Sequence, residues 1–431
     1  MTLTDVKKIK VAILAEEPIG WASGKHFFPV ILQGYSWKGK HQEYTIETSY
    51  IFDKDIRENK LNSSNYDVLL VPGGGVGDGE CVTKGLTLFP RVKIWKKNIQ
   101  TFIRNGGGYV GICGGAALLT ELETANSRKT FIEKLYDKSS LQVSTVKSYY
   151  KEIAFPLFYP FQRWFPEKSG PLAYVFSFQP GKTMDNRRIL ASGVPVTCKI
   201  DAEHDFFTGF THNHICLRWW GGPGLIVPRN TDREVSILAR YPAKDFSTDD
   251  KTQIKAWVYT GGILGFIRGL RKAARYIKKQ NKNIKQLLTY FFYFTGDWKK
   301  TDKIVDLDLA NRPCITTEIY PNDNKARIFL CTTHPEYMIW KNGDIQEVED
   351  NQFNCIGKGF HRWESIKDFS KDGIKELTHS WWIIRRAVAW AAKIPSEDFP
   401  PIHESIDIKI MNELKQDVFW DGTLDHQMAK I

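Results

Sequence analysis

The first 125 residues alternate short apolar runs with stretches of helical periodicity, and this alternation restricts the fold more than any other feature. Residues 9–15 and 67–71 are nearly continuous apolar runs, and residues 44–52 alternate between apolar and polar. Strands that consist of unbroken apolar residues are buried on both faces, as in parallel sheets joined by helical crossovers. We therefore predict an α/β fold with a mostly parallel sheet flanked by helices.

Further elements follow from the same periodicities. The predicted helices cover residues 26–34, 85–104, 116–123, 266–288 and 374–394, the last with a strongly amphipathic pattern. The predicted later strands cover residues 109–112, 194–200, 214–219, 235–241 and 326–332. Residues 149–178 are crowded with aromatic residues and prolines, which favours irregular structure that fills a core.

Composition places the chain among ordinary globular proteins. The 431 residues include 42% hydrophobic and 25% charged residues, which excludes a disordered or collagen-like chain. The seven cysteines are odd in number and form no C-x-x-C pair, so we expect reduced thiols rather than disulfides or a zinc ribbon. The sequence shows no signal peptide and no apolar stretch of about 20 residues, which predicts a cytoplasmic protein.

One segment has the pattern of a nucleophile elbow. Residues 107–117 read as an apolar strand that ends at Cys113, with Gly111, Gly114 and Gly115 around it, and continue as a helix. Small neighbours permit the strained turn that projects a nucleophile at the end of a strand. A thiol at a helix N-terminus also lies at the positive end of the helix dipole, which favours the thiolate. The alternative interpretation is a buried structural cysteine in a tight crossover.

A second segment supplies a candidate base. Residues 327–333 read as a strand that places His334 at its end, and Glu336 follows two residues later. A carboxylate beside a histidine can fix the tautomer of the ring and stabilise the imidazolium that forms when a thiol loses its proton. The alternative interpretation is a histidine that only packs or caps at the end of a strand.

Together these segments resemble the class I glutamine amidotransferase-like family. The resemblance rests on a strand that runs into Pro72–Gly75, the elbow at Gly111–Gly115 and a strand that runs into Thr333–Glu336. Within the family, the order of the motifs is most similar to the amino-terminal domain of biotin–protein ligases and its stand-alone relatives. Trp219–Gly224 and Val235–Tyr241 also look like that subfamily. The resemblance covers about residues 9–125, 194–241 and 305–395 and implies a flavodoxin-like sheet.

The resemblance also implies roles for individual residues. Cys113 would be the nucleophile, His334 the general base and Glu336 the carboxylate that orients the base. The backbone of five glycines would bind the substrate oxyanion: Gly73, Gly74, Gly75, Gly114 and Gly115. The reaction implied is attack on a carboxamide or related acyl group through a thioester, without metal or cofactor.

Two departures from the family pattern matter: the residue at the usual glutamine position, and the 221 residues from Cys113 to His334, which indicate a large insertion between the two motifs. Ala117 stands where glutamine amidotransferases usually carry a substrate-binding glutamine, four residues after the nucleophile. The chain also lacks a biotinyl-adenylate loop and a phosphate-binding loop, so an acceptor or ligase function would have to come from a separate chain. Three hypotheses therefore stay open: an amidase acting on a small amide, a catalytically silent binding or regulatory module, and a cysteine peptidase or deglycase.

The positive charge is concentrated in one part of the chain. Residues 251–294 contain ten basic residues and no acidic residue, which accounts for nearly all of the net charge of +11. The segment is either a solvated helix or a helix that binds an anionic membrane surface, and we expect no specific nucleic acid as a partner. His212, His214 and Cys216 alternate along a strand, but only two of them could share one ion, so we predict no metal site.

The sequence suggests four parts. Residues 1–241 are the first part of the core and include an irregular, aromatic-rich segment over 126–193. Residues 242–304 form a basic helical insertion, residues 305–395 complete the core with the His-Pro-Glu strand end and a C-terminal helix, and residues 396–431 form a helical tail.

Overall fold

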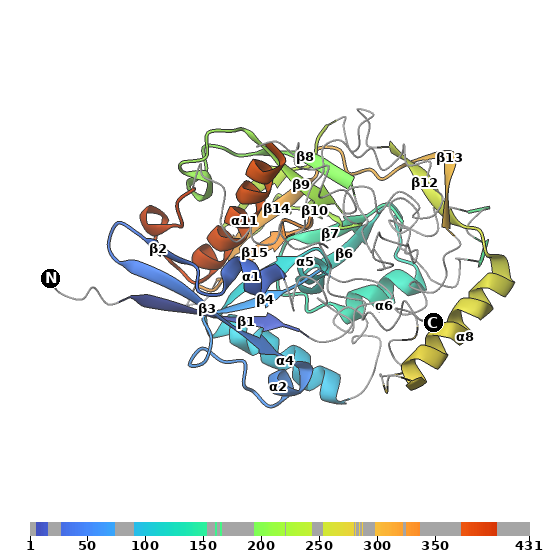
Figure 1. The fold of residues 1–431 in the computed structure, drawn as a ribbon, viewed down its shortest axis with the longest axis horizontal. Helices are drawn as coiled ribbons and strands as arrows, with labels where there is room; N and C mark the ends of the chain where they lie inside the picture. The colour runs from blue at the N-terminus through green and yellow to red at the C-terminus, as the bar shows by residue number, and fades with distance from the viewer. Residues whose placement is uncertain are drawn as a thin grey trace.

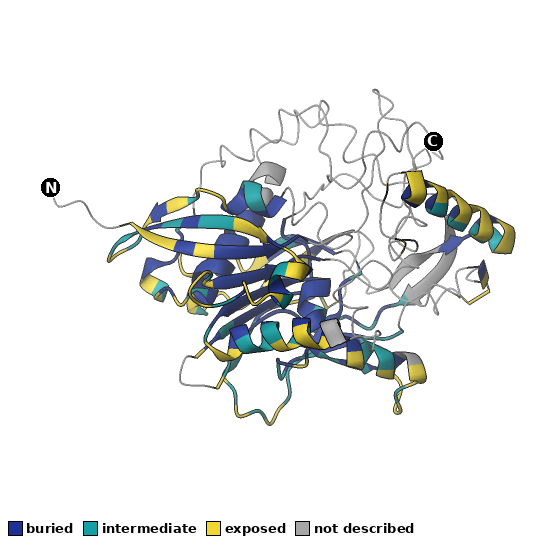
Figure 2. Cartoon of the chain, turned by 90° about the horizontal axis from the view of Figure 1, so that it is seen from below, coloured by how far each residue is buried: buried dark blue, intermediate teal, exposed yellow. Residues whose placement is uncertain are grey.

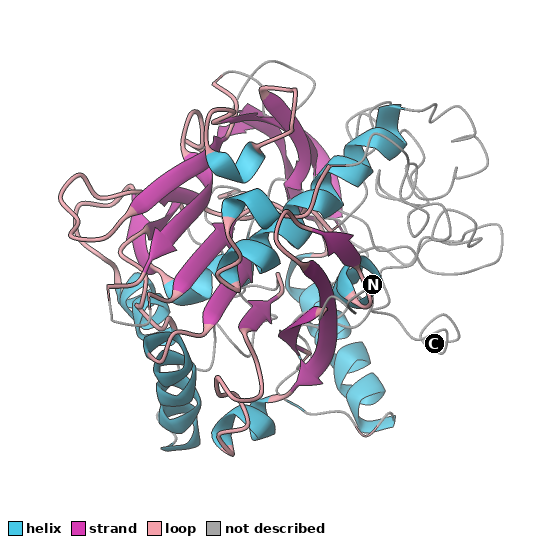
Figure 3. Ribbon diagram, turned by 90° about the vertical axis from the view of Figure 1, so that its left-hand side faces the viewer, coloured by secondary structure: helices cyan, strands magenta, loops and turns pink. Residues whose placement is uncertain are grey.

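The fold is built on one ten-stranded sheet with helices on both faces (Figure 1 and Figure 3). The computed structural model describes residues 6–15, 27–73, 90–152, 160–161, 164–165, 194–219, 221–243, 253–279, 281, 284, 287, 298–321, 325–336 and 372–402. The strand order is β2-β3-β1-β4-β5-β15-β14-β11-β8-β9.

Five parallel strands form the centre of this sheet. They are β3 (Glu43–Ile51), β1 (Lys7–Leu14), β4 (Val68–Val71), β5 (Gly108–Ile112) and β15 (Arg327–Cys331). Numbered along the chain, their order is 2-1-3-4-5, the doubly wound order of flavodoxin-like sheets. The predicted α/β fold with a parallel sheet is confirmed. In such sheets ligands bind beyond the carboxyl ends of the strands, where β4, β5 and β15 all point.

Antiparallel strands extend the sheet on both sides of this centre. They are β2 (Ser36–Lys38) on one edge and β14 (Pro313–Ile319), β11 (Val235–Arg240), β8 (Val194–Ile200) and β9 (His214–Trp219) on the other. The sequence patterns predict β8, β9 and β11 but not their direction or their membership of the same sheet. The later part of the chain therefore completes the sheet that the first 112 residues begin.

The two faces of the sheet carry separate hydrophobic cores. Along β1, Val11 and Ile13 point into one core, and Ala12 and Leu14 point into the other. The first core lies under α1 (Phe28–Leu32) and α11 (Asp372–Ala391). The second lies under α2 (Asp53–Arg57), α4 (Pro90–Arg104) and α5 (Gly114–Leu119). The alternation of buried side chains explains why this strand reads as an unbroken apolar run.

Smaller elements surround the main sheet. A three-stranded sheet contains β10 (Gly224–Ile226), β7 (Lys147–Tyr150) and β6 (Glu121–Thr124), and a two-stranded sheet pairs β12 (Gln253–Tyr259) with β13 (Trp298–Asp306). The remaining helices are α6 (Phe131–Ser139), α8 (Gly262–Lys279) and the short turns η5 (Asp205–Phe207) and η8 (Ser396–Asp398). None of the helices in the described ranges is long and apolar enough to cross a membrane.

Three predicted helices differ from the structure. The helix after the elbow ends at Leu119 rather than at residue 123, because Thr120 is extended and residues 121–124 join β6. The basic helix begins at Gly262 and ends at Lys279. The C-terminal helix is buried on every side from Thr378 to Ala391, rather than on one face only. Residues 403–431 of the predicted tail lie outside the described residues. Most of the aromatic-rich segment, residues 149–178, also lies outside them.

Candidate functional site

Cys113 lies at the carboxyl end of β5 in a backbone conformation that L-residues rarely adopt. Its φ is 48° and its ψ is −107°, and the next residue begins α5. The backbone N–H of Cys113 donates to the carbonyl oxygen of Cys331 at the end of β15, at 2.7 Å. Strained positions of this kind cost about 1–3 kcal/mol each, and they concentrate at functional sites. The turn predicted from the glycine pattern is therefore present.

The glycines of the elbow are required by close packing of backbone on backbone. A Cβ atom built on Gly115 would lie 2.1 Å from the carbonyl oxygen of Val71, and one built on Gly111 would lie 2.6 Å from the carbonyl oxygen of Gly115. Because backbone atoms in packed elements cannot move aside, no larger residue fits at either position. These contacts bring the first turn of α5 against the end of β4.

His334 and Glu336 lie next to this elbow. Nδ1 of His334 is 2.8 Å from Oε1 of Glu336, and the imidazole also hydrogen-bonds with the thiol of Cys113. A Cβ atom built on Gly73 would lie 2.3 Å from Cε1 of His334 and 3.2 Å from Cβ of Cys113, so Gly73 borders both side chains. The ends of β4, β5 and β15 thus bring together the three side chains that the sequence nominates.

Electrostatics within this cluster favour a protonated histidine. Burial disfavours the imidazolium, but the negative charges of Cys113 and Glu336, together with hydrogen bonds to both, outweigh it and raise the pKa of His334 to about 10. His334 is 3% exposed and Glu336 is fully buried, so little solvent screens these charges. A thiolate paired with an imidazolium is the activated form of a cysteine nucleophile.

Neighbouring strands hold the histidine in place. The backbone N–H of His334 donates to the carbonyl oxygen of Arg218 at 2.7 Å, which forms an isolated antiparallel bridge to β9. On the other side, Nε1 of Trp381 in α11 donates to the carbonyl oxygen of Glu336 at 3.2 Å. Neither Arg218 nor Trp381 is predictable as a supporting residue, because nothing in its local sequence marks a partner more than 40 residues away.

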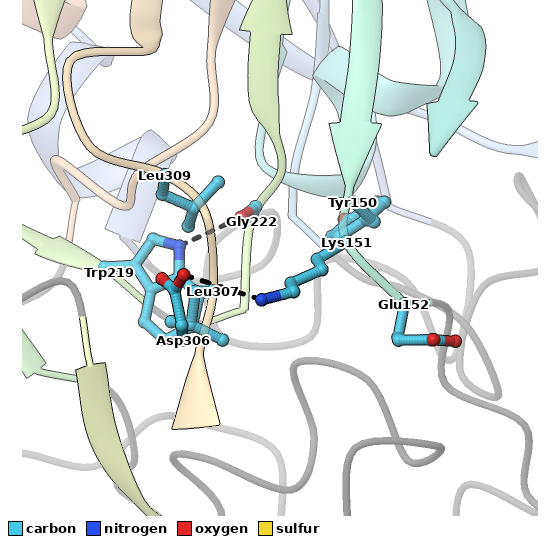
Figure 4. Close-up of a pocket in the computed structure, with 8 residues that line it drawn as sticks. All are labelled: Tyr150, Lys151, Glu152, Trp219, Gly222, Asp306, Leu307 and Leu309. Atoms are coloured by element: carbon cyan, nitrogen blue, oxygen red, sulfur yellow. Dashed lines mark hydrogen bonds and ion pairs between the residues drawn. The ribbon is translucent and has the colours of Figure 1, made fainter. Parts of the chain in front are cut away.

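Figure 4 shows a small cavity whose lining includes Trp219, the chain neighbour of Arg218, and Gly222, where an added Cβ would lie 1.8 Å from the carbonyl oxygen of Thr332. Its empty volume is about 280 Å³, part of which is open to solvent, and its walls include Tyr150, Trp219 and Gly222. Nζ of Lys151 is 3.5 Å from Oδ2 of Asp306 at the same cavity. Burial, followed by the nearby charges of Cys113 and Tyr136, raises the pKa of Tyr150. Tyr150 therefore lines the cavity and lies within electrostatic range of Cys113, and the sequence did not predict it.

The remaining predicted residues have mixed outcomes. Gly114 and Gly115 form the first turn of α5, which begins two residues before the predicted helix, and their role in binding an oxyanion stays a prediction. Gly74 and Gly75 lie outside the described residues. His212 packs on the rings of Phe210 and His379. Within the described ranges, no group of three or more His, Cys, Asp or Glu side chains is arranged to hold a metal ion. None of the five cysteines that the structure describes forms a disulfide.

Comparisons with known proteins found only distant structural similarity. No family model and no curated protein matches the sequence. A ThuA-like protein from Bacteroides uniformis is similar at 12% identity and a TM-score of 0.32, over 82% of this chain and 89% of the other. A glutamine amidotransferase from Thermotoga maritima is similar at 10% identity and a TM-score of 0.25, over 66% of this chain and 96% of the other. Neither is a biotin–protein ligase, and that finer resemblance stays a prediction.

Proposed function

We propose that the protein is a cysteine hydrolase that acts on a small carboxamide or a related acyl compound. The observation that carries the proposal is the cluster at the strand ends, where a strained Cys113 contacts His334 and His334 contacts the buried Glu336. The order of side chains is that of a nucleophile, its base and the carboxylate that orients the base.

The proposed reaction has two steps. In the first, the Cys113 thiolate attacks the carbonyl carbon, and the backbone N–H of Gly114 at the start of α5 stabilises the oxyanion. The C–N bond breaks as the His334 imidazolium gives its proton to the leaving nitrogen, which departs as ammonia or an amine. In the second, His334 takes a proton from water, which attacks the thioester and releases the carboxylic acid and the thiol.

The small cavity lined by Trp219 and Gly222 supports a small polar substrate. Tyr150 and Trp219 give it aromatic walls, and Lys151 and Asp306 place opposite charges at its edge. Apolar walls with a few fixed polar groups are usual for sites that bind small molecules. A polypeptide substrate is a poorer match, because Cys113 is only 8% exposed.

The direct test is ammonia release from a panel of small carboxamides, glutamine included, with trapping of the Cys113 peptide as an acyl thioester by mass spectrometry. Cys113→Ala should abolish both signals. Cys216→Ala is the matched control, since Cys216 is a partly exposed free thiol on β9, and it should keep full activity. If no amide is hydrolysed while an amide still binds to Cys113→Ala with unchanged affinity, the protein is a binding module instead.

A further inference from the structure

Helix α8 presents an exposed face of unusual composition. Nine of its residues are exposed, and they all lie within one half of the helix circumference at 100° per residue. The apolar members are Ile263, Leu264 and Ile267, and the basic members are Arg268, Arg271, Lys272, Arg275, Lys278 and Lys279. Figure 2 shows this exposed face along the length of the helix. We call these nine residues the α8 outer face.

The apolar residues of the α8 outer face lie together at the first two turns of the helix. Leu264 is 74% exposed, Ile263 is 55% exposed and Ile267 is 39% exposed. Single exposed aliphatic residues are common on globular proteins, but three in adjacent positions on one helix form a patch. The positive charges begin at Arg268 and continue to the end of the helix, and no acidic residue occurs anywhere in residues 251–294.

The opposite face of the helix is fixed to the body of the protein. Gly265, Gly269, Ala273, Tyr276 and Ile277 are buried, and the last two belong to the larger hydrophobic core together with Tyr259 at the end of β12. The helix therefore does not need its outer face for packing. Because the inner face is anchored, the nine outer residues are presented on one side of the molecule.

We propose that the α8 outer face binds the surface of an anionic membrane. Six cations would meet lipid phosphate and carboxylate groups, while the aliphatic side chains of the first two turns would insert among the acyl chains near the headgroups. A nucleic acid would use the cations equally well but would leave the aliphatic patch unpaired, so the patch favours lipid. Binding of this kind is peripheral and adds a location to the proposed hydrolase without depending on its activity.

The test is flotation of the full chain with vesicles of phosphatidylcholine alone or with about one third phosphatidylserine, over a salt series. Two variants and one control separate the contribution of the cations to binding from that of the aliphatic side chains. Arg271→Glu/Arg275→Glu reverses two cations of the outer face, and Leu264→Ser/Ile267→Ser removes two aliphatic side chains. Lys93→Glu/Lys97→Glu on α4 is the matched control, since these exposed lysines have the same i, i+4 spacing and give the same change of net charge.

The wild type should float with anionic vesicles and not with neutral ones, and salt should weaken binding. The arginine variant should bind at least about tenfold more weakly and the control pair nearly as well as the wild type. The serine variant should bind more weakly at every salt concentration. The proposal is overturned if the wild type does not float, if the two charge reversals weaken binding equally, or if binding to a short RNA or DNA duplex persists where flotation is absent.

Discussion

The backbone of His334 is paired with Arg218, a residue of the last antiparallel strand of the sheet. The N–H of His334 donates to the carbonyl oxygen of Arg218 at 2.7 Å, although β9 stands at the far end of the strand order from β15. The sheet therefore curls enough to bring its edge back to the site. As a result, the long chain between Cys113 and His334 helps to position the proposed base.

The reactivity of Cys113 should depend on His334. With the imidazolium beside it, Cys113 should react with iodoacetamide at pH 7 at least about tenfold faster than the partly exposed Cys216. His334→Gln should slow alkylation of Cys113 by about the same factor and leave Cys216 unchanged. Peptide mass spectrometry after short exposure measures both rates. Equal rates at the two cysteines in the wild type would show that the cluster does not activate the thiol.

The charge of His334 should be visible in its titration. Because the pKa of His334 is raised from 6.5 to about 10, its ring should stay protonated at pH 8. Glu336→Gln should lower this pKa, since it removes one of the negative charges that sustain the imidazolium. Nuclear magnetic resonance of histidine-labelled protein follows the ring directly. A His334 that titrates near pH 6.5 in the wild type would contradict the ion pair.

The raised pKa of His334 should also make the stability of the fold depend on pH. A group whose pKa is higher in the folded state stabilises the fold most below its unfolded pKa, and loses that contribution as the pH rises through the folded pKa. The contribution of His334 should therefore be complete below about pH 6.5 and lost near pH 10. Urea unfolding should show a difference between wild type and Glu336→Gln at pH 7 that shrinks at pH 10. A difference that grows with pH would have the wrong sign.

Substitution at Gly73 should disturb the cluster although none of its three side chains is replaced. In Gly73→Ala the new Cβ would lie 2.3 Å from Cε1 of His334. The ring cannot move away easily, because Glu336 holds its Nδ1 and Arg218 holds the backbone N–H of His334. Alkylation of Cys113 should slow by about tenfold, and the overpacking should also lower the thermal unfolding midpoint. In a His334→Gln background the same change should have almost no further effect. If Gly73→Ala and His334→Gln slow alkylation additively, Gly73→Ala does not act through His334.

The site residues were predictable because each is marked by its local sequence. Cys113 has glycines at fixed offsets, and His334 follows a short apolar strand that ends in polar residues. Such signals depend on backbone strain and on close packing within a few residues, which the sequence records locally. The parallel centre of the sheet was predictable for the same reason, since β1 and β4 are buried on both faces.

The remaining parts of the fold could not be predicted from local sequence, because they depend on contacts between distant segments. Residues 121–124 continue a helical pattern in sequence but pair with β7 instead, so the predicted helix is cut short. Helix α11 looks amphipathic because Arg386 interrupts its apolar residues, yet this arginine is buried and donates to the carbonyl oxygens of Phe206, Thr208 and Pro400. A charged residue whose donors are all directed at backbone carbonyls is compatible with a buried face, and only the fold supplies those carbonyls.

Asp398 in η8 anchors the last described segment to the edge of the sheet that is formed by β2 and β3. Its carboxylate accepts hydrogen bonds from Oη of Tyr44 at 2.6 Å and from the backbone N–H of His41 at 2.9 Å. Burial would raise the pKa of Asp398, but these donors and the charge of His41 outweigh it and lower the pKa. The carboxylate should therefore stabilise the fold at neutral pH, and this contribution should be lost as the pH falls below about 3.8.

Asp398→Ala should reduce the free energy of unfolding by about 2 kcal/mol at pH 7, because it leaves the buried hydroxyl of Tyr44 and the partly buried N–H of His41 without their acceptor. Tyr44→Phe removes the hydroxyl and leaves the bonds from His41, so it should cost about 1 kcal/mol. Urea denaturation at pH 7 and at the lowest pH where the protein stays folded measures both differences, and the cost of Asp398→Ala should be smaller in acid. If Asp398→Ala costs less than Tyr44→Phe, the carboxylate does not anchor this segment, and the hydrophobic packing of α11 alone holds the C-terminal part of the fold in place.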